Sequence, residues 1–223
     1  MGRLPVAHTG DMDASGWNER YAASTVWSGE PNAALVEMVS GLRGSPDRPA
    51  GSPLPTALDI GCGEGADARW LAAHGWDVTG VDWSDVALER ARSAIQEAGL
   101  VATFAQGDAT DADFLAGLSP TGTFDLITLA FIHPEPEERH AAYGHLPGLV
   151  APGGHLLVIA HDPTHGLRGF GGPPPSRLMS PDVILRALSL PADFEVLMAD
   201  VPPREEGGEV VALDSVVLVH RAA

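Results

Sequence analysis

Residues 57–65 read ALDIGCGEG, and this stretch decides the fold of the 223-residue chain. An apolar run reaches Asp59 and Ile60 and then opens into three alternating glycines, Gly61, Gly63 and Gly65. The following residues, 66–73, have helical composition, so the segment predicts a strand, a tight turn and a helix. Glycines at such a turn allow positive φ angles and let a ligand approach without a Cβ in the way.

A second acidic residue indicates what kind of ligand this turn binds. Asp82 closes the next apolar run, residues 78–81. A carboxylate at the end of that strand can accept hydrogen bonds from both hydroxyls of a ribose. In open α/β sheets, nucleotide-like ligands bind at the carboxyl ends of the strands. The turn, the helix and Asp82 therefore predict a nucleoside-binding βαβ unit.

NAD is the first competing ligand, because Gly61-x-Gly63-x-x-Ala66 also satisfies the dinucleotide fingerprint. Asp59 argues against NAD, since its carboxylate would repel a pyrophosphate but suits a ligand with an amino group and a sulfonium. The third glycine at Gly65 fits a turn approached by an amino acid and a ribose.

Five segments of the chain resemble, in order and at similar spacing, the motifs of one family. That family is the class I S-adenosylmethionine-dependent methyltransferases, and the small-molecule types of the thiopurine, halide/thiol and tellurite-resistance kind are the most similar. The resemblance covers about residues 56–160. The segments are Ala57–Gly65, Val78–Ser84, Gln106–Ala109, Phe124–Ala130 and Leu149–Val158.

Alternating strands and helices predict an α/β fold with a mostly parallel, doubly wound sheet and helices on both faces. We expect strands near 56–60, 77–82, 102–106, 124–130 and 155–161, and helices near 65–74, 85–98, 111–117 and 136–149. Ser84 is the expected N-cap of the second helix. A further helix is expected at Pro181–Leu188.

The last two apolar runs, Phe194–Val201 and Val210–Val219, are joined by a short Pro/Glu/Gly segment. This connection is too short for a crossover helix, so the two runs must form an antiparallel hairpin. The resemblance implies a Rossmann-like, seven-stranded sheet that ends in such a hairpin. We expect one globular domain, with lid helices and a Pro/Gly linker over residues 1–55 and the methyltransferase domain over 56–223.

Composition and net charge restrict the classes of substrate that the chain can bind. Lys and Arg number 13 against 30 Asp and Glu, giving a formal net charge of −17. Such a surface repels phosphate backbones and anionic membranes, so a small molecule is a better substrate than DNA, RNA or lipid. Cys62 is the only cysteine, and no apolar run resembles a secretory signal or a membrane span. We expect a cytoplasmic monomer or homodimer.

The resemblance also implies a cofactor site for S-adenosylmethionine, which leaves as S-adenosylhomocysteine. Asp59 and the backbone of the glycine turn would face its methionine part, and Asp82 its ribose. Trp83 would lie against the adenine. The remaining implied contacts are Asp108 and Ala109 at the adenine amino group, and Leu129 and Ala130 near the sulfonium.

Three groups of residues are candidates for binding the molecule that accepts the methyl group. Trp17, Tyr21 and Trp27 resemble a lid segment, and a ring face attracts a cation such as a sulfonium. Candidate general bases follow two strands, namely His133, His161 and Asp162, since histidine titrates near neutral pH. The Gly/Pro-rich loop after residue 162 is the expected specificity loop, with His165, Arg168 and Phe170 as candidate substrate contacts.

A metal site is weighed at the same place and not predicted. His161 and His165 have metal-ligand spacing only on a helix, and Pro163 and Gly166 argue against a helix there. The predicted function is transfer of a methyl group to a small-molecule acceptor by SN2 displacement. An NAD-dependent oxidoreductase and a non-catalytic S-adenosylmethionine-binding module remain the alternatives.

Overall fold

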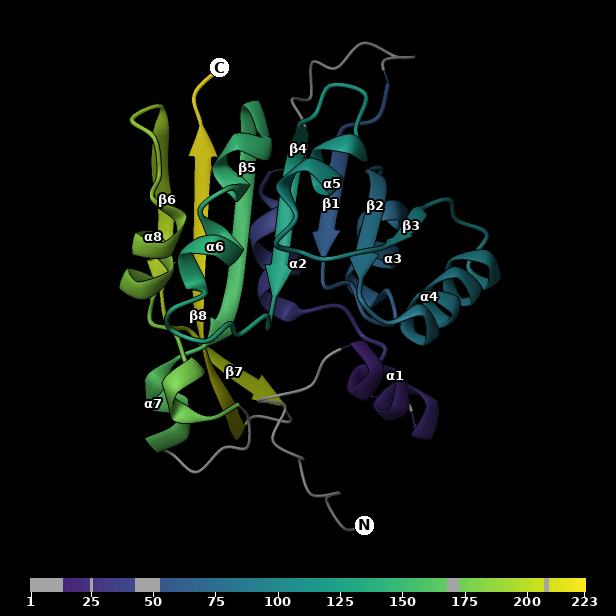
Figure 1. Cartoon of the computed structure of the whole chain (residues 1–223), viewed down its shortest axis with the longest axis horizontal. Helices are drawn as coiled ribbons and strands as arrows, with labels where there is room; N and C mark the ends of the chain where they lie inside the picture. The colour runs from purple at the N-terminus through teal and green to yellow at the C-terminus, as the bar shows by residue number, and fades with distance from the viewer. Residues whose placement is uncertain (1–13, 25, 43–52, 168–172, 207–208) are drawn as a thin grey trace.

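The computed structural model describes residues 14–24, 26–42, 53–167, 173–206 and 209–223. Its centre is a sheet whose first five strands run parallel, with their carboxyl ends at one edge (Figure 1). Their order across the sheet is β3-β2-β1-β4-β5. The bounds are β1 Thr56–Ile60, β2 Asp77–Asp82, β3 Thr103–Gln106, β4 Phe124–Ala130 and β5 Val150–His161.

The antiparallel end of the sheet separates this fold from a dinucleotide-binding domain. Strand β8 (Glu209–Arg221) lies between β5 and β6 (Phe194–Asp200) and is antiparallel to both. A dinucleotide-binding sheet would instead continue with a parallel sixth strand after the fifth. The predicted C-terminal hairpin and the seven strands along the main path of the sheet are confirmed.

One further strand, β7 (Pro203–Glu206), falls in the segment that the sequence predicts to be a turn. The pairing of β5 with β8 ends at the register partners His161 and Asp214. The beginning of β8 runs past that point and pairs with β7 instead. This extension places β7 at the carboxyl edge of the sheet, on the same side as α1 (Ala14–Ala23) and α7 (Pro163–Leu167) (Figure 1).

Helices cover both faces of the sheet, as predicted. On one face, α2 (Ala33–Ser40) and α3 (Ala66–Ala73) pack against buried side chains of β1, β4 and β5. Asn32 starts α2, because its side chain accepts hydrogen bonds from the N–H groups of Ala34 and Leu35. Since Leu35 and Val39 of α2 are fully buried, this helix belongs to the core of the domain.

The opposite face carries the second layer of helices. It consists of α5 (Ala112–Gly117), α6 (Arg139–Tyr143), the 3₁₀ turn η1 (Leu146–Leu149) and α8 (Pro181–Leu188). The single helix expected over 136–149 is two short pieces, because Gly144 and Pro147 interrupt it. The short 3₁₀ turn η2 (Pro175–Arg177) leads into α8.

Helix α4 (Asp85–Glu97) flanks β2 and β3 and begins as predicted. Ser84 is its N-cap, and its hydroxyl accepts a hydrogen bond from the N–H of Ala87. The helix buries Leu88, Ala91 and Ile95 on one side. Among the described helices, none has the length and apolar composition needed to cross a membrane.

Helix α7 corrects the expectation that Pro163 and Gly166 exclude a helix after β5. Proline is tolerated at the first helical position, where its missing N–H would be unpaired anyway. The carboxylate of Asp162 accepts hydrogen bonds from the N–H and hydroxyl of Thr164, which caps this helix. The short helix therefore carries His165 back toward the end of β5.

Candidate functional site

The glycine turn after β1 has the backbone that its sequence requires. The φ angles of Gly61, Gly63 and Gly65 are 71°, 51° and 80°. A Cβ at Gly65 would lie 2.7 Å from the Cβ of Ala91, so only glycine lets α3 and α4 approach this closely. The N–H groups of Gly61 and Cys62 both donate to the carbonyl of Val81, which ties the turn to β2.

Asp82, at the end of β2, is fixed against the same turn. One carboxylate oxygen accepts a hydrogen bond of 2.8 Å from the Gly63 N–H, and the other accepts one of 2.9 Å from the Ser84 N–H. Each oxygen has a second lone pair that can accept from a hydroxyl. Burial raises the pKa of Asp82, although its backbone hydrogen bonds oppose that rise.

Asp59 is a buried carboxyl group directly below the turn. Its Oδ1 accepts a hydrogen bond of 2.9 Å from the hydroxyl of Thr128 on β4. Its Oδ2 is buried and has no hydrogen-bond partner among the described residues. Burial, and next the nearby carboxylate of Asp67, raise the pKa of Asp59 to about 8. A buried acceptor of this kind suits a cationic amino group.

The residues predicted at the adenine end differ in how they are held. The Trp83 side chain is 38% exposed, so one face is accessible to a flat ring. Asp108 is exposed, and its Oδ1 accepts hydrogen bonds from the N–H and hydroxyl of Thr110, as in an Asx turn. Ala109 packs against the hydrophobic core. Thr110 engages Oδ1 of Asp108 and leaves Oδ2 without a hydrogen bond from Thr110.

The end of β4 closes the turn from the other side. Leu129 is a buried core residue, so only its backbone can face a ligand at this edge, whereas Ala130 is half-buried. Phe131 follows with a φ of 61°, which is uncommon for a non-glycine residue. A Cβ at Gly61 would lie 2.8 Å from Cδ1 of Ile132, so this side chain borders the turn.

The aromatic residues of α1 and the following segment lie over the turn. Tyr21 is 3% exposed, and its hydroxyl accepts a hydrogen bond of 3.0 Å from the indole N–H of Trp27. A Cβ at Gly63 would lie 3.0 Å from that hydroxyl. The ring of Trp17 lies 5.7 Å from the ring of Tyr21. Burial, and next the charge of Asp82, raise the pKa of Tyr21.

Polar contacts connect the α1 segment to the turn, and the sequence reasoning missed them. The Glu64 carboxylate accepts hydrogen bonds from the N–H groups of Val26 and Trp27 and forms a 2.6 Å ion pair with Arg90 of α4. Asn18 accepts a 2.5 Å hydrogen bond from the Ser84 hydroxyl. An acidic residue between two glycines was the available signal for Glu64.

The second half of the site lies at the end of β5. His161 Nδ1 and Asp214 Oδ1 of β8 are 2.7 Å apart. The His161 ring stacks with the His165 ring of α7 at a centroid distance of 4.3 Å and lies 4.6 Å from the Phe131 ring. With Nδ1 donating to the carboxylate, the Nε2 of His161 is free to accept a proton.

The other two predicted bases have structural partners. His133 Nε2 accepts a hydrogen bond of 3.1 Å from the His161 N–H, so its lone pair is engaged. Burial, and next the neighbouring His161, lower the pKa of His133 to about 3. The Asp162 carboxylate caps α7 and accepts a second hydrogen bond from the hydroxyl of Ser215.

Asp214 and Arg204 were not among the residues chosen from the sequence. Arg204 of β7 lies over the Phe131 ring, and its Nε is 3.5 Å from Asp214 Oδ2, an ion pair without hydrogen-bond geometry. Asp214 and Ser215 interrupt the apolar run of β8, and this polar pair was the available signal. The predicted contacts Arg168 and Phe170 lie outside the described residues.

The amino-acid sequence matches known proteins over the segment that builds the turn. Residues 57–154 match the family model described as a methyltransferase domain. Over these residues the chain is similar to the S-adenosylmethionine-dependent methyltransferases. The geometry around Asp59, Asp82 and the glycine turn fits the cofactor of that family, since it offers an unpartnered acceptor, a fixed carboxylate and a turn without Cβ atoms.

Two curated relatives and one solved structure illustrate the range of this methyltransferase family. The chain is 34% identical over 108 residues to a demethylmenaquinone methyltransferase of Thermus thermophilus, covering 48% of this chain and 47% of that protein. It is 29% identical over 161 residues to a 2-heptyl-1-hydroxyquinolin-4(1H)-one methyltransferase of Mycobacteroides abscessus, covering 70% and 65%. The match thus spans less than two thirds of either relative.

The solved structure extends the likeness to the whole fold. An S-adenosylmethionine-dependent methyltransferase from Anabaena variabilis superposes with a TM-score of 0.67 at 18% identity, covering 99% of this chain and all of that one. At this identity the likeness establishes the methyltransferase fold.

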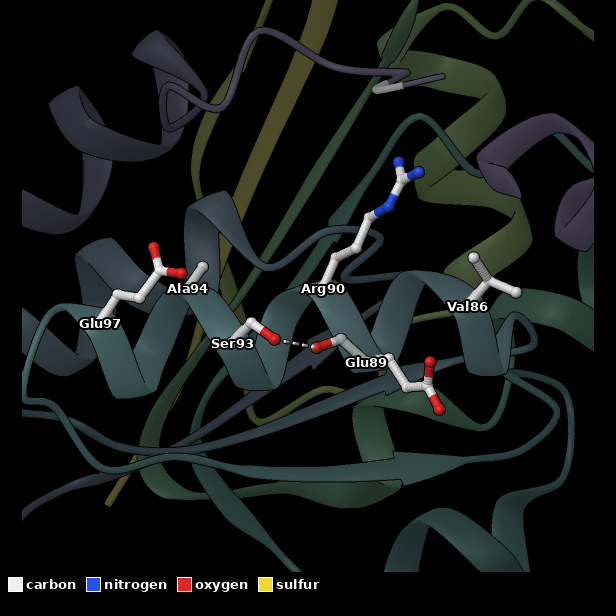
Figure 2. A pocket seen from close by; sticks show the side chains of 6 residues that line it. All are labelled: Val86, Glu89, Arg90, Ser93, Ala94 and Glu97. Carbon is white, nitrogen blue, oxygen red and sulfur yellow. Dashed lines mark hydrogen bonds between the residues drawn. The ribbon is translucent and has the colours of Figure 1, made fainter. Parts of the chain in front are cut away.

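A surface hollow of about 370 Å³ lies along α4, and one of its lining residues, Arg90, forms the ion pair with Glu64 of the turn (Figure 2). It is lined by Val86, Glu89, Arg90, Ser93, Ala94 and Glu97. All six belong to one helix, and the Ser93 hydroxyl only bonds the Glu89 carbonyl of the preceding turn. The hollow therefore does not replace the carboxyl edge of the sheet as the candidate site.

Proposed function

We propose that this chain is an S-adenosylmethionine-dependent methyltransferase that methylates a small-molecule acceptor. The observation that carries the proposal is the glycine turn with Asp82 fixed against it and a buried Asp59 oxygen without a partner. In this proposal Asp82 binds the ribose hydroxyls, and Asp59 receives the cationic amino group. Trp83 and Asp108 contact the adenine.

The cofactor, when bound, supplies a methyl group already activated by a positive sulfur. The residues of the chain then align the acceptor, which can lower the barrier by roughly 7–11 kcal/mol. The acceptor's lone pair forms the new bond to carbon, and the electron pair of the old bond stays on sulfur. For a hydroxyl acceptor, we propose that His161 Nε2 takes the hydroxyl proton while Asp214 holds the imidazole through Nδ1.

We propose that the acceptor is a hydroxylated aromatic ring rather than a nucleic acid. The rings of Phe131 and His161 are half-buried at this edge, and the buried His165 ring stacks on His161, so a flat acceptor can contact the exposed parts of the first two. The relatives named above act on a demethylmenaquinone and a hydroxyquinolone, by their names. The net charge of −17 opposes a phosphate backbone.

We further propose that the lid consists of α1 and the segment to Trp27, without α2. Tyr21 and Trp27 lie over the turn, and the contacts of Glu64 and Ser84 hold this segment in place. In contrast, α2 contributes Leu35 and Val39 to the core. A lid of this extent can open without exposing the core of the domain.

The first experiment is a set of calorimetric titrations with S-adenosylmethionine, S-adenosylhomocysteine and NAD. We expect binding of the first two and none of NAD, and binding of NAD alone would overturn the proposal. Acceptor assays with a phenol, a hydroxyquinolone and a thiol then follow methyl transfer by mass. Cofactor binding without transfer to any of these acceptors would favour the non-catalytic binding module.

A further inference from the structure

Three metal-ligating side chains from three separate elements meet at the carboxyl edge of the sheet. They are His161 at the end of β5, His165 on α7 and Asp214 on β8. Each offers one ligand atom, and these three atoms lie within 4.8 Å of one another. We propose that this cluster, hereafter the His–His–Asp cluster, is a binding site for a divalent transition-metal ion such as Zn²⁺.

The composition of the cluster selects the type of cation. Two imidazoles and one carboxylate are borderline ligands that suit Zn²⁺, Co²⁺ or Ni²⁺, whereas Mg²⁺ and Ca²⁺ prefer oxygen ligands. Zinc binds nitrogen and oxygen ligands at about 2.0–2.2 Å, which puts tetrahedral ligand atoms roughly 3.3 Å apart. The cluster must therefore contract by about 1.5 Å at its widest, a movement within reach of side-chain rotation.

One imidazole nitrogen of the cluster is a hydrogen-bond acceptor, and its contact is long. The Leu213 N–H points at His165 Nδ1 over 3.3 Å, which marks this nitrogen as unprotonated, and a metal on it would displace this long contact. Asp214 is already oriented, because its second oxygen faces Arg204 at 3.5 Å. An outer partner of this kind fixes a ligating carboxylate, although the charge of Arg204 also weakens the attraction for a cation.

The neighbouring candidates for a fourth ligand are engaged elsewhere. His133 Nε2 accepts the His161 N–H, and the Asp162 oxygens accept hydrogen bonds from Thr164 and Ser215. Among the residues that the structure describes, the site therefore offers three protein ligands, and the fourth position can be taken by water or by an oxygen of the acceptor. Three protein ligands with an open position are typical of catalytic rather than structural zinc sites.

A metal ion at the His–His–Asp cluster is not part of the proposed methyl transfer, and its binding would limit that reaction. A metal ion shared by His161 and Asp214 would bind Nδ1, the nitrogen that faces the carboxylate. The neutral imidazole would then carry its proton on Nε2, which could no longer accept a proton from the acceptor. Occupancy would therefore remove the proposed general base, so that Zn²⁺ controls the acceptor half of the site without touching the glycine turn.

The test is a calorimetric titration of the chelator-treated full chain with ZnCl₂ in the absence of cofactor and acceptor. We expect one equivalent to bind, with an affinity at least tenfold weaker in His165→Gln and in Asp214→Asn. Co²⁺ should show the visible absorption of a four- or five-coordinate ion, which His165→Gln should lose. Circular dichroism of each variant verifies that it is folded, and wild-type thermal stability should rise with Zn²⁺.

The matched control uses a histidine pair that lies on β5 and β8 outside the His–His–Asp cluster. His155 and His220 are register partners on β5 and β8, with ring centroids 4.8 Å apart. His220→Gln should leave the Zn²⁺ affinity unchanged. Absence of saturable binding, or loss of binding in His220→Gln but not in His165→Gln, would overturn the proposal. S-adenosylhomocysteine binding, measured separately, shows whether the proposed function fails with it.

Discussion

The two halves of the candidate site are built in different ways. The glycine turn and Asp82 come from one βαβ unit, residues 56–82, and their contacts are backbone hydrogen bonds between neighbours in the sequence. The acceptor half joins the ends of β4, β5 and β8 with α7 and β7. Its contacts are side-chain stacks and ion pairs between residues distant in the sequence.

This difference separates what a family shares from what an individual member does. A turn that depends on positive φ and missing Cβ atoms tolerates few residues, so its sequence can change little without loss of the turn. An acceptor surface of stacked rings depends on strand register and loop length, which can change without disturbing the turn. The substrate half is therefore the place where this chain can differ from its relatives.

The largest expected effect is on catalysis in the acceptor half. His161→Asn should lower the turnover of a hydroxyl acceptor by about 10²–10⁴-fold, equivalent to about 2.7–5.4 kcal/mol, because a general base is lost. Binding of S-adenosylhomocysteine should stay unchanged. His74→Asn, on the C-terminal side of α3, is the control. Equal turnover of the two variants would contradict the role of His161.

The next largest effect is on the free energy of unfolding and tests the close packing of α3 and α4 at the turn. Gly65→Ala should destabilise the fold by roughly 2–5 kcal/mol, since it adds left-handed strain and a clash with Ala91. Gly75→Ala is the matched control, because Gly75 has a φ of 85° and nothing near its Cβ position. Urea unfolding should give roughly 1–2 kcal/mol for Gly75→Ala. Similar losses for the two variants would mean that close approach of α3 and α4 is unimportant.

A smaller effect tests the ribose contact. Asp82→Asn should weaken S-adenosylhomocysteine binding by roughly 1.5–3 kcal/mol, because a charge-assisted acceptor is lost while the side chain keeps its size. Calorimetry on Asp85→Asn, three residues further along at the start of α4, gives the control value. If both variants bind as tightly as the wild type, Asp82 is not at the ribose.

The smallest effect, taken per pH unit, is a pH dependence of stability that comes from Asp59. Its pKa is raised to about 8 in the folded chain, above its ordinary value near 3.8, so its contribution to stability is complete below pH 4 and disappears as the pH rises through 8. The slope is at most about 1.4 kcal/mol per pH unit. Asp59→Asn should flatten this slope in unfolding experiments between pH 5 and 8. An unchanged slope would place the titrating group elsewhere.

Most of the fold follows from local patterns in the sequence. The apolar runs and the glycine turn predict nearly all bounds of the five parallel strands, and Ser84 predicts the start of α4. These signals are local, because the period of burial and the backbone demands of glycine act within a few residues. Helix α8 lies at its expected bounds, Pro181–Leu188. The prediction of a single helix over 136–149 is wrong, because Gly144 and Pro147 interrupt it, although glycine and proline are signals that the sequence itself contains.

The residues proposed to bind the cofactor could be predicted from the sequence. Those proposed to bind the acceptor could be predicted only in part. The sequence placed His133, His161 and His165 near one edge, but it ranked them alike. Only the register of β5 with β8 brings Asp214 to His161, and only the backbone of β5 occupies the lone pair of His133. These contacts depend on the pairing of segments that are more than 25 residues apart along the chain.

By itself, the sequence determined the strand–turn–helix unit, the succession of strands and helices along the chain and the residues proposed to bind the cofactor. Those properties depend on residues that touch their own neighbours. The tertiary structure alone decided that Pro163 begins a helix, that β7 lies at the carboxyl edge, and that His161, His165 and Asp214 meet. The position of β7 and the meeting of the three side chains depend on long-range strand pairing, whose register cannot be derived from local propensity. The start of α7 depends on Asp162, which caps a helix that begins at a proline.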